Sequence, residues 1–195
     1  MDPNLKPFNN ERDIELPHFF SFLGETLPNT LMDVGAAHTH AIYAEQLRKI
    51  VPNYMGVDPQ RDPIVENIVD RYIVEKIHDV DERADFVSCI SVIEHIEDTK
   101  ERLLAVNKLL LLSDKYVYLT FPYGNSPDFS EYNYRAVNTT ELGQIFTMMK
   151  INKFTMKFDM TFNHCPPEWR ETTDQNLFTN DDVVRCVRIL KMVKD

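Results

Sequence analysis

The segment TLMDVGAAHTH, at residues 30–40, carries residue types suited to ligand binding. It reads as a buried strand that runs into a tight turn, where Gly35 lets the backbone turn sharply while it approaches a ligand. Asp58 follows 23 residues after Gly35, a spacing that suits a carboxylate accepting hydrogen bonds from ribose hydroxyls. Gly35 and Asp58 together predict a site for either a dinucleotide or an adenosyl cofactor.

The glycine content of this segment separates the two cofactor classes. A dinucleotide loop of the G-x-G-x-x-G type needs later glycines for the pyrophosphate and for helix packing. Ala37 and His40 stand at the corresponding positions. A cofactor without phosphates asks less of the turn, so the segment favours an adenosyl cofactor. A nucleotide-sugar or nicotinamide enzyme is the alternative.

His38 and His40 are the only pair of imidazoles close in sequence that suggests a metal. Their i, i+2 spacing at a strand-to-helix turn makes a poor ligand pair without an identified carboxylate or thiolate. We therefore predict no metal site, and we expect both side chains to fill space that glycines would leave.

Length and composition are those of one globular domain spanning residues 1–195. Hydrophobic residues make up 43% of the chain, and no apolar run approaches the roughly 20 residues that cross a bilayer. The formal net charge of -10 disfavours a nucleic-acid interface, because such affinity comes mainly from basic side chains. The three cysteines lack CxxC spacing and are expected to be reduced. No secretory signal pattern opens the chain, so we expect a cytoplasmic protein whose partner is a small molecule, without a membrane or nucleic-acid partner.

Strand-like and helix-like segments alternate along the chain and predict the elements that position these residues. Asp62, Asp98 and Asn138 precede helical patterns as capping residues. The expected strands are 30–34, 53–58, 72–80, 85–91, 115–121, 153–162 and 181–193, and the expected helices are 14–27, 39–50, 61–72, 98–112 and 138–150.

This alternation predicts an α/β fold, namely a Rossmann-like, doubly wound, mainly parallel seven-stranded sheet with helices on both faces. The last two strands are expected to form a C-terminal antiparallel pair, with Phe154, Met156, Phe158 and Met160 on one side of the first. Ligands of such sheets bind beyond the carboxyl ends of the strands, near the point where strand order reverses. The turns after the first five strands are therefore the candidate site.

The ordered segments LMDVGAAHT, YMGVDPQ, DFVSCISVIEHIED and KYVYLTFPYG resemble the successive motifs of class I S-adenosylmethionine-dependent methyltransferases. The chain is most similar to the small single-domain members that methylate sugars and other small molecules. The match runs from about residue 30 to 124, and V-x-E-H-x-x-D after a strand is common in this family. The resemblance implies S-adenosylmethionine as cofactor. It also implies an N-terminal helical segment (1–29), a cofactor-binding core (30–124) and a substrate-side part (125–195).

Position by position, the resemblance implies a set of cofactor-binding residues. From the methionine end through the ribose and adenine to the transferable methyl, they are Asp33, Gly35, Ala37, Asp58, Pro59, Asp79, Ser91 and Val92. Gln60 is expected beside the adenine with Pro59. Asp81 is the alternative to Asp79, because strand ends are read from sequence only to within a few residues.

Methyl transfer from a sulfonium is an in-line displacement, so the protein mainly has to align the acceptor and exclude water. An acceptor hydroxyl would benefit from a general base. His95 is the catalytic candidate by position, ahead of His38, Tyr123 and His164. A structural role for His95, as a helix cap or a loop contact, is the alternative.

The aromatic-rich loop PYGNSPDFSEYNYR is expected to contact the acceptor through Tyr123, Tyr132 and Tyr134. Trp169 offers either a sugar-stacking surface or an anchor for its own loop. These residues predict methyl transfer to a small molecule, with a sugar or metabolite hydroxyl as the acceptor. The family commonly carries D-x-G-x-G-x-G where this chain has DVGAAHT, so a catalytically inactive binding or scaffold domain is the alternative.

Overall fold

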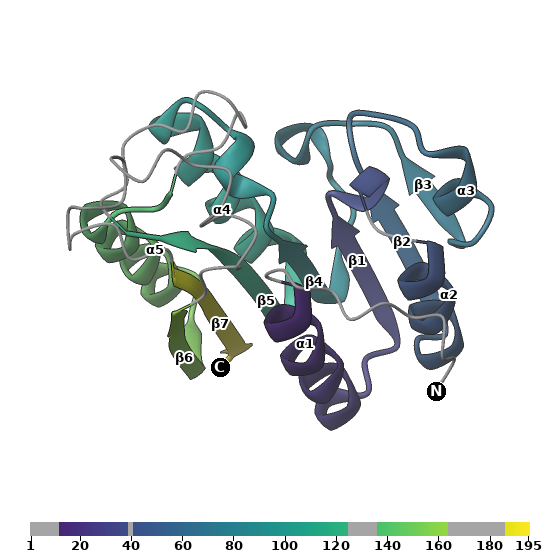
Figure 1. Cartoon of the computed structure of the whole chain (residues 1–195), viewed down its shortest axis with the longest axis horizontal. Helices are drawn as coiled ribbons and strands as arrows, with labels where there is room; N and C mark the ends of the chain where they lie inside the picture. The colour runs from purple at the N-terminus through teal and green to yellow at the C-terminus, as the bar shows by residue number, and fades with distance from the viewer. Residues whose placement is uncertain (1–11, 39–40, 125–135, 164–185) are drawn as a thin grey trace, which may run out of the picture.

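One seven-stranded sheet is found in the part of the chain that this computed structural model describes, residues 12–38, 41–124, 136–163 and 186–195 (Figure 1). In sheet order the strands are β3 (Arg71–Ile73), β2 (Asn53–Val57), β1 (Thr30–Val34), β4 (Ala84–Ile90), β5 (Ser113–Tyr123), β7 (Cys186–Lys194) and β6 (Phe154–Asn163). The helices are α1 (Arg12–Thr26), α2 (Ala41–Ile50), α3 (Pro63–Glu66), α4 (Thr99–Leu112) and α5 (Thr139–Ile151). Three short 3-10 turns are η1 (Ala36–His38), η2 (Ile77–Asp79) and η3 (Ile93–His95).

The sheet is parallel from β3 through β5, and β7 lies antiparallel between β5 and β6. The predicted fold class is therefore confirmed. After β1 the chain adds β2 and β3 on one side and then crosses to β4 on the other side. This reversal leaves a crevice at the carboxyl ends of β1 and β4, which is where open α/β sheets bind ligands.

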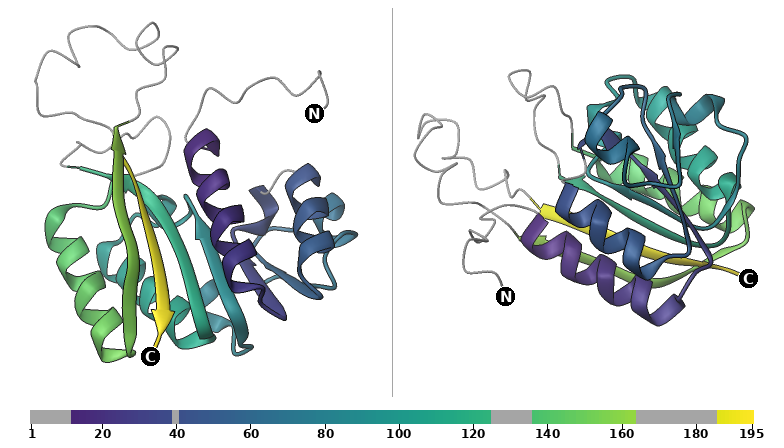
Figure 2. Two further views of the ribbon diagram at one scale, coloured as in Figure 1. Left: turned by 90° about the horizontal axis from the view of Figure 1, so that it is seen from below. Right: turned by 90° about the vertical axis from the view of Figure 1, so that its right-hand side faces the viewer.

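Helices cover both faces of the sheet, and each face has its own apolar cluster. The right-hand view of Figure 2 shows α1 and α2 on one side of the sheet, with α4 and α5 on the other. On the α1 side, Phe19 and Phe22 pack against the rings of Phe86 and Tyr118 from the central strands. This aromatic packing holds α1 across the middle of the sheet, beside the crevice.

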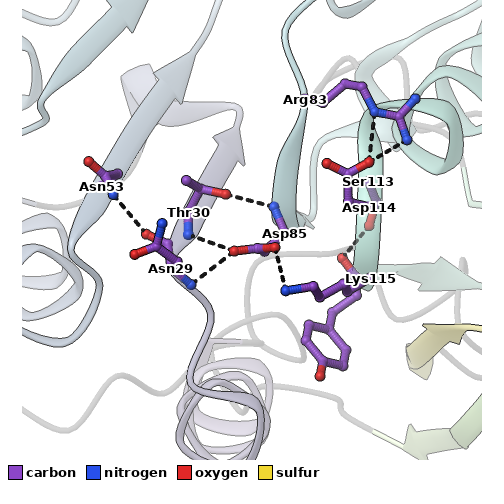
Figure 3. Close-up of polar contacts among 9 residues, drawn as sticks. Asn29, Thr30, Asn53, Arg83, Asp85, Ser113, Asp114 and Lys115 are labelled. Carbon is purple, nitrogen blue, oxygen red and sulfur yellow. Dashed lines mark hydrogen bonds and ion pairs between the residues drawn. The ribbon is translucent and has the colours of Figure 1, made fainter.

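The amino ends of β1, β4 and β5 are joined through Asp85, at the end of the sheet opposite the crevice (Figure 3). Its carboxylate accepts hydrogen bonds from the backbone N–H groups of Asn29 at 3.0 Å and Thr30 at 3.2 Å. The Lys115 ammonium lies 2.8 Å from the same carboxylate. That hydrogen bond, followed by those from the backbone, holds the pKa of Asp85 below its usual value.

Three helix starts follow the predicted capping chemistry. The Asp62 carboxylate accepts from two backbone N–H groups of α3, and Asp98 accepts from the third residue of α4. Asn138 and Glu141 form a reciprocal capping box on α5. The helix α3 spans only four residues, so the expected helix over 61–72 is much shorter than predicted.

The third predicted strand, over 72–80, is also wrong beyond its first two residues. The strand β3 ends at Ile73, because β2 offers it only a three-residue register at the edge of the sheet. The chain then turns through η2, and Ile77 and Val80 become buried in the core.

The expected one-sided pattern of the strand β6 is wrong as well. Phe154 and Met156 pack with the α4 and α5 cluster, whereas Phe158 packs with the α1 cluster. The pairing of β6 with β7 shifts register between Met156 and Phe158. Such a bulge moves the residues that follow it to the opposite face, and Met160 is 44% exposed.

Candidate functional site

A cavity of about 790 Å³ opens at the carboxyl ends of β1, β2 and β4, between α1 and the start of α4. This volume lies within the range of small-molecule sites. Its wall includes Asp33, Gly35, Asp58, Pro59, Ser91, Val92 and His95. The fold therefore brings together most of the predicted cofactor-binding residues and the predicted catalytic residue.

Gly35 forms the turn after β1 for two separate physical reasons. Its φ is +91°, a conformation that side-chain-bearing residues rarely adopt. A Cβ placed on Gly35 would also lie 2.3 Å from Cγ2 of Val92, which is too close for any carbon contact. The turn after β1 and the turn after β4 thus pack directly on each other.

Ala37 stands without backbone strain at a position where the resemblance in sequence implies glycine. Leu27, Ser91 and Lys153 are the described non-glycine residues with positive φ, and Ala37 does not belong to this group. Its backbone N–H donates to Oδ2 of Asp58 at 3.2 Å. The turn therefore keeps its connection to the end of β2 although the glycine is lost.

Asp58 joins the turns that follow β1 and β2. Its side chain is buried, with residue exposure of 4%, yet it reaches the cavity wall. Besides Ala37, the backbone N–H of Gln60 donates to Oδ1 at 2.8 Å. These two donors orient the carboxylate at the cavity wall.

Asp33, at the end of β1, is held by two hydroxyl donors from neighbouring strands. Ser88 donates to Oδ1 at 2.8 Å and Tyr54 donates to Oδ2 at 3.2 Å. Burial, followed by the charge of Asp33, raises the pKa of Tyr54 far above its usual value. Tyr54 is therefore a permanent neutral donor, and Asp33 is fixed as an acceptor beside Gly35.

The wall near the predicted adenine position contains two of the expected residues but neither of the two candidate aspartates. Pro59 and Gln60 line the cavity, whereas Asp79 is exposed and does not belong to the lining. Asp81 is exposed too, and it pairs with Lys108 at 3.3 Å. The residues that line this end after β3 are Glu75, Lys76, Ile77 and His78. Because β3 ends six residues before Asp79, the cavity faces the segment that precedes the two predicted aspartates.

The end of β4 carries a strained residue at the cavity wall. Ser91 has a φ of +50° and lies directly before Val92. Its backbone N–H donates to the carbonyl and to Oγ1 of Thr120 on β5, and its Oγ donates to Glu15 at 2.6 Å. Ser91 is thus held by both β5 and α1.

The helix α1 supplies cavity residues that the sequence did not single out. Arg12, Leu16, Phe19 and Phe20 line the cavity, and Glu15 is fully buried beneath it. Glu15 lies four residues before Phe19, on the same face of the helix. A carboxylate on the apolar face of a helix was the one signal in the sequence that could have revealed this role.

The predicted acceptor side is described only in part. His95 is exposed at the cavity wall, next to Ile96, while Asp98 provides the cap of α4. Tyr123 is not among the lining residues; its hydroxyl contacts Oγ1 of Thr139 at 3.2 Å, and the Arg188 guanidinium lies over its ring. The predicted residues Tyr132, Tyr134, His164 and Trp169, and the side chain of His38, lie outside the described residues.

The charge of the cavity wall suits a cationic ligand. Five carboxylates (Asp33, Asp58, Glu75, Asp98 and Glu101) line it, against two permanent cations (Arg12 and Lys76). Among the described residues, no group of three His, Cys, Asp or Glu side chains could hold a metal ion. No helix in the described ranges is long and apolar enough to cross a membrane.

Comparison with known proteins identifies the family. A family described as a methyltransferase domain matches residues 8–174. No curated protein is significantly similar to the chain. Because the family match spans most of the sequence, this chain belongs to the methyltransferase-domain family, and its fold is that of the class I S-adenosylmethionine-dependent methyltransferases. The family cofactor is S-adenosylmethionine.

Solved structures share this fold at low sequence identity. Magnesium protoporphyrin IX methyltransferase from Synechocystis, with bound S-adenosylmethionine, has a TM-score of 0.61 at 13% identity, covering 94% of this chain and 79% of that chain. N-methyltransferase NodS from Bradyrhizobium japonicum, in complex with S-adenosyl-L-homocysteine, has a TM-score of 0.63 at 10% identity, covering 100% and 93%. The [4+2]-cyclase SpnF has a TM-score of 0.61 at 11% identity, covering 91% and 80%. The fold alone therefore does not define the reaction.

Proposed function

We propose that this protein binds S-adenosylmethionine in the cavity at the ends of β1, β2 and β4 and transfers its methyl group to a small molecule. The observation that carries the proposal is the convergence of Gly35, Asp58 and Ser91 on one carboxylate-rich wall. The sulfonium of the cofactor supplies an already activated methyl group. The excess of carboxylates offsets that positive charge.

The residues of the chain take specific parts in this proposal. Asp58 accepts hydrogen bonds from the ribose hydroxyls, and its own contacts with Ala37 and Gln60 hold it in place for that task. Asp33 and Gly35 border the methionine end, and Ser91 with Val92 borders the methyl group. Pro59 and the segment 75–78 flank the adenine, because they form the wall at that end. Asp79 follows this segment and does not line the cavity, so we propose no direct contact between Asp79 and the cofactor.

We propose that the acceptor atom is a hydroxyl oxygen and that His95 removes its proton. His95 is exposed at the cavity wall, within the same segment as Val92 and Ile96, so an acceptor placed there can reach its ring. His95→Gln is expected to lower kcat by about a hundredfold, the usual contribution of a general base. The affinity of the His95→Gln variant for S-adenosylhomocysteine should equal that of the wild type, since in this proposal the imidazole of His95 does not bind the cofactor.

Isothermal titration with S-adenosylmethionine and S-adenosylhomocysteine tests the cofactor, with NADH as the comparison ligand. Asp58→Asn is expected to weaken binding by tenfold to a hundredfold, because hydrogen bonds to a charged acceptor contribute roughly 1.5–3 kcal/mol. The matched control is Asp81→Asn, which removes the same charge from an exposed position and should bind as the wild type does. Folded wild-type protein that binds neither adenosyl ligand would refute the proposal.

Release of S-adenosylhomocysteine in the presence of a panel of small hydroxyl, amine and carboxylate acceptors tests turnover. Product formed with a hydroxyl acceptor supports the proposed reaction. Tight cofactor binding with no product from any acceptor would favour the non-catalytic binding domain instead.

A further inference from the structure

The carboxylate of Glu15 connects α1 to the ends of two central strands. Its Oε1 accepts from Ser91 Oγ at 2.6 Å and from Thr120 Oγ1, while Oε2 pairs with Arg12 at 2.7 Å. The Tyr118 hydroxyl donates to the backbone carbonyl of Glu15 at 2.6 Å. These partners come from α1, from β5 and from the turn after β4, so this one buried residue joins three parts of the chain at the edge of the cavity.

Ser91 is the partner whose conformation needs support. A φ of +50° is unfavourable for serine, and such a conformation persists only where the surroundings hold it. Glu15 and Thr120 hold its side chain and its backbone N–H, respectively. Val92, the next residue, packs directly against Gly35 in the turn after β1. A chain of contacts therefore runs from Glu15 through Ser91 and Val92 to the turn after β1.

Stabilisation of the fold alone does not explain this arrangement. The ion pair of Glu15 and Arg12 is only partly buried, since the Arg12 side chain is 29% exposed. Ion pairs contribute little net stability, and apolar residues of similar volume in place of buried pairs are often as stable or more so. Phe19 and Phe22 on the same helix already provide apolar packing against the sheet. The hydrogen bonds of the Glu15 side chain are instead concentrated where the strand β4 ends at the cavity.

We propose that Glu15 is a positioning residue of the methyl-transfer site, and this inference rests on the proposed function. Its carboxylate fixes the left-handed turn at Ser91, and this sets the position of Val92 against Gly35 and of α1 over the cavity. Glu15 does not itself line the cavity, so it acts through Ser91 and not on the acceptor.

The test combines Glu15→Gln with a control on the same helix and a rescue variant. Phe22→Leu is the control, because Phe22 packs on Phe86 and does not line the cavity. Ser91→Gly is the rescue variant, because glycine adopts a positive φ without support. Titration with S-adenosylhomocysteine gives the affinity, and hydrogen exchange of residues 84–96 reports the turn at Ser91 without any ligand.

Glu15→Gln is expected to weaken S-adenosylhomocysteine binding by about tenfold and to accelerate hydrogen exchange at Ser91. Phe22→Leu should change the affinity and the exchange rate by no more than about twofold, even if it lowers Tm as much as Glu15→Gln does or more. In the Ser91→Gly background, Glu15→Gln should weaken S-adenosylhomocysteine binding by less than about threefold, because the turn no longer depends on the carboxylate.

Equal losses of affinity in Glu15→Gln and Phe22→Leu, or an effect of Glu15→Gln that is unchanged in the Ser91→Gly background, would overturn the positioning role. Wild-type protein that fails to bind S-adenosylhomocysteine would overturn the proposed function as well. The two failures are distinguishable, because the first occurs in a protein that binds the ligand.

Discussion

Gly35→Ala should lower the free energy of unfolding through two separable effects on the turn after β1, namely an unfavourable backbone conformation and a steric clash. The added methyl must occupy a backbone with a φ of +91°, which costs an L-residue about 1–2 kcal/mol. It must also displace Val92, since the 2.3 Å approach to Cγ2 is impossible, and overpacking of this kind costs about 1–3 kcal/mol. The free energy of unfolding should therefore fall by about 2–5 kcal/mol.

Urea denaturation followed by circular dichroism measures this loss, and two further variants assign it. Gly143→Ala is the matched control, because its Cβ meets no atom within 4 Å and it lies inside α5. Alanine in a helix is favoured over glycine, so this variant should gain up to about 1 kcal/mol. Adding Val92→Ala to Gly35→Ala leaves the Cβ of residue 92 as the nearest atom, at 3.4 Å from the added methyl. The double variant should therefore recover the free energy lost to overpacking, while the loss caused by the positive φ remains.

A Gly35→Ala protein as stable as the wild type would refute this reasoning about the turn. A double variant that recovers nothing would show that the contact with Val92 is not the source of the loss. S-adenosylhomocysteine titration of the same proteins should show weaker binding wherever the turn is displaced, and unchanged binding in Gly143→Ala.

Three further predictions concern the scaffold. The pKa of Asp85 is lowered in the folded state, chiefly by the hydrogen bond from Lys115, so its contribution is present above the ordinary carboxyl pKa and is lost as pH falls through the folded value. Asp85→Asn should therefore lower the free energy of unfolding by about 1–2 kcal/mol at pH 7 and by much less near pH 3, as measured by urea titration. Wild type and variant whose free energies of unfolding change in parallel with pH would contradict this. Arg102→Ala leaves the buried Glu141 without its ion-pair partner, which should cost about 3–5 kcal/mol by thermal unfolding. Arg102→Met with Glu141→Leu should recover only part of that loss, because Glu141→Leu also removes the capping box of α5. Burial raises the pKa of the Cys89 thiol well above its usual value, so mass spectrometry should find Cys89 unmodified by iodoacetamide until the protein unfolds.

The order of strands and helices could be predicted because it depends on local patterns. Apolar runs, capping residues and turn residues are short-range signals, and Asp62, Asp98 and Asn138 cap their helices as expected. The end of β3 and the bulge in β6 could not be predicted in this way. Both depend on pairing with a neighbouring strand, which is not encoded in the segment itself.

The candidate site also contains residues that local sequence reveals and one that depends on tertiary contacts. Gly35, Asp58 and Ser91 are recognisable in the sequence because each lies just beyond a strand, and parallel strands bring such ends to one edge of the sheet. Glu15 lies in a different part of the chain, and its spacing in α1 indicates only which face of the helix it occupies. Its contact with Ser91 spans 76 positions in sequence.

The sequence by itself determined the α/β class, the segments that meet at the cavity and the family to which the chain belongs. Local chemistry suffices for these, since periodicity, capping and motif spacing are properties of short segments. Only the tertiary structure decided that Ala37 has no positive φ, that residues 75–78 and not Asp79 line the cavity, and that Glu15 of α1 accepts a hydrogen bond from Ser91. Those outcomes depend on which surfaces pack together once the sheet has formed.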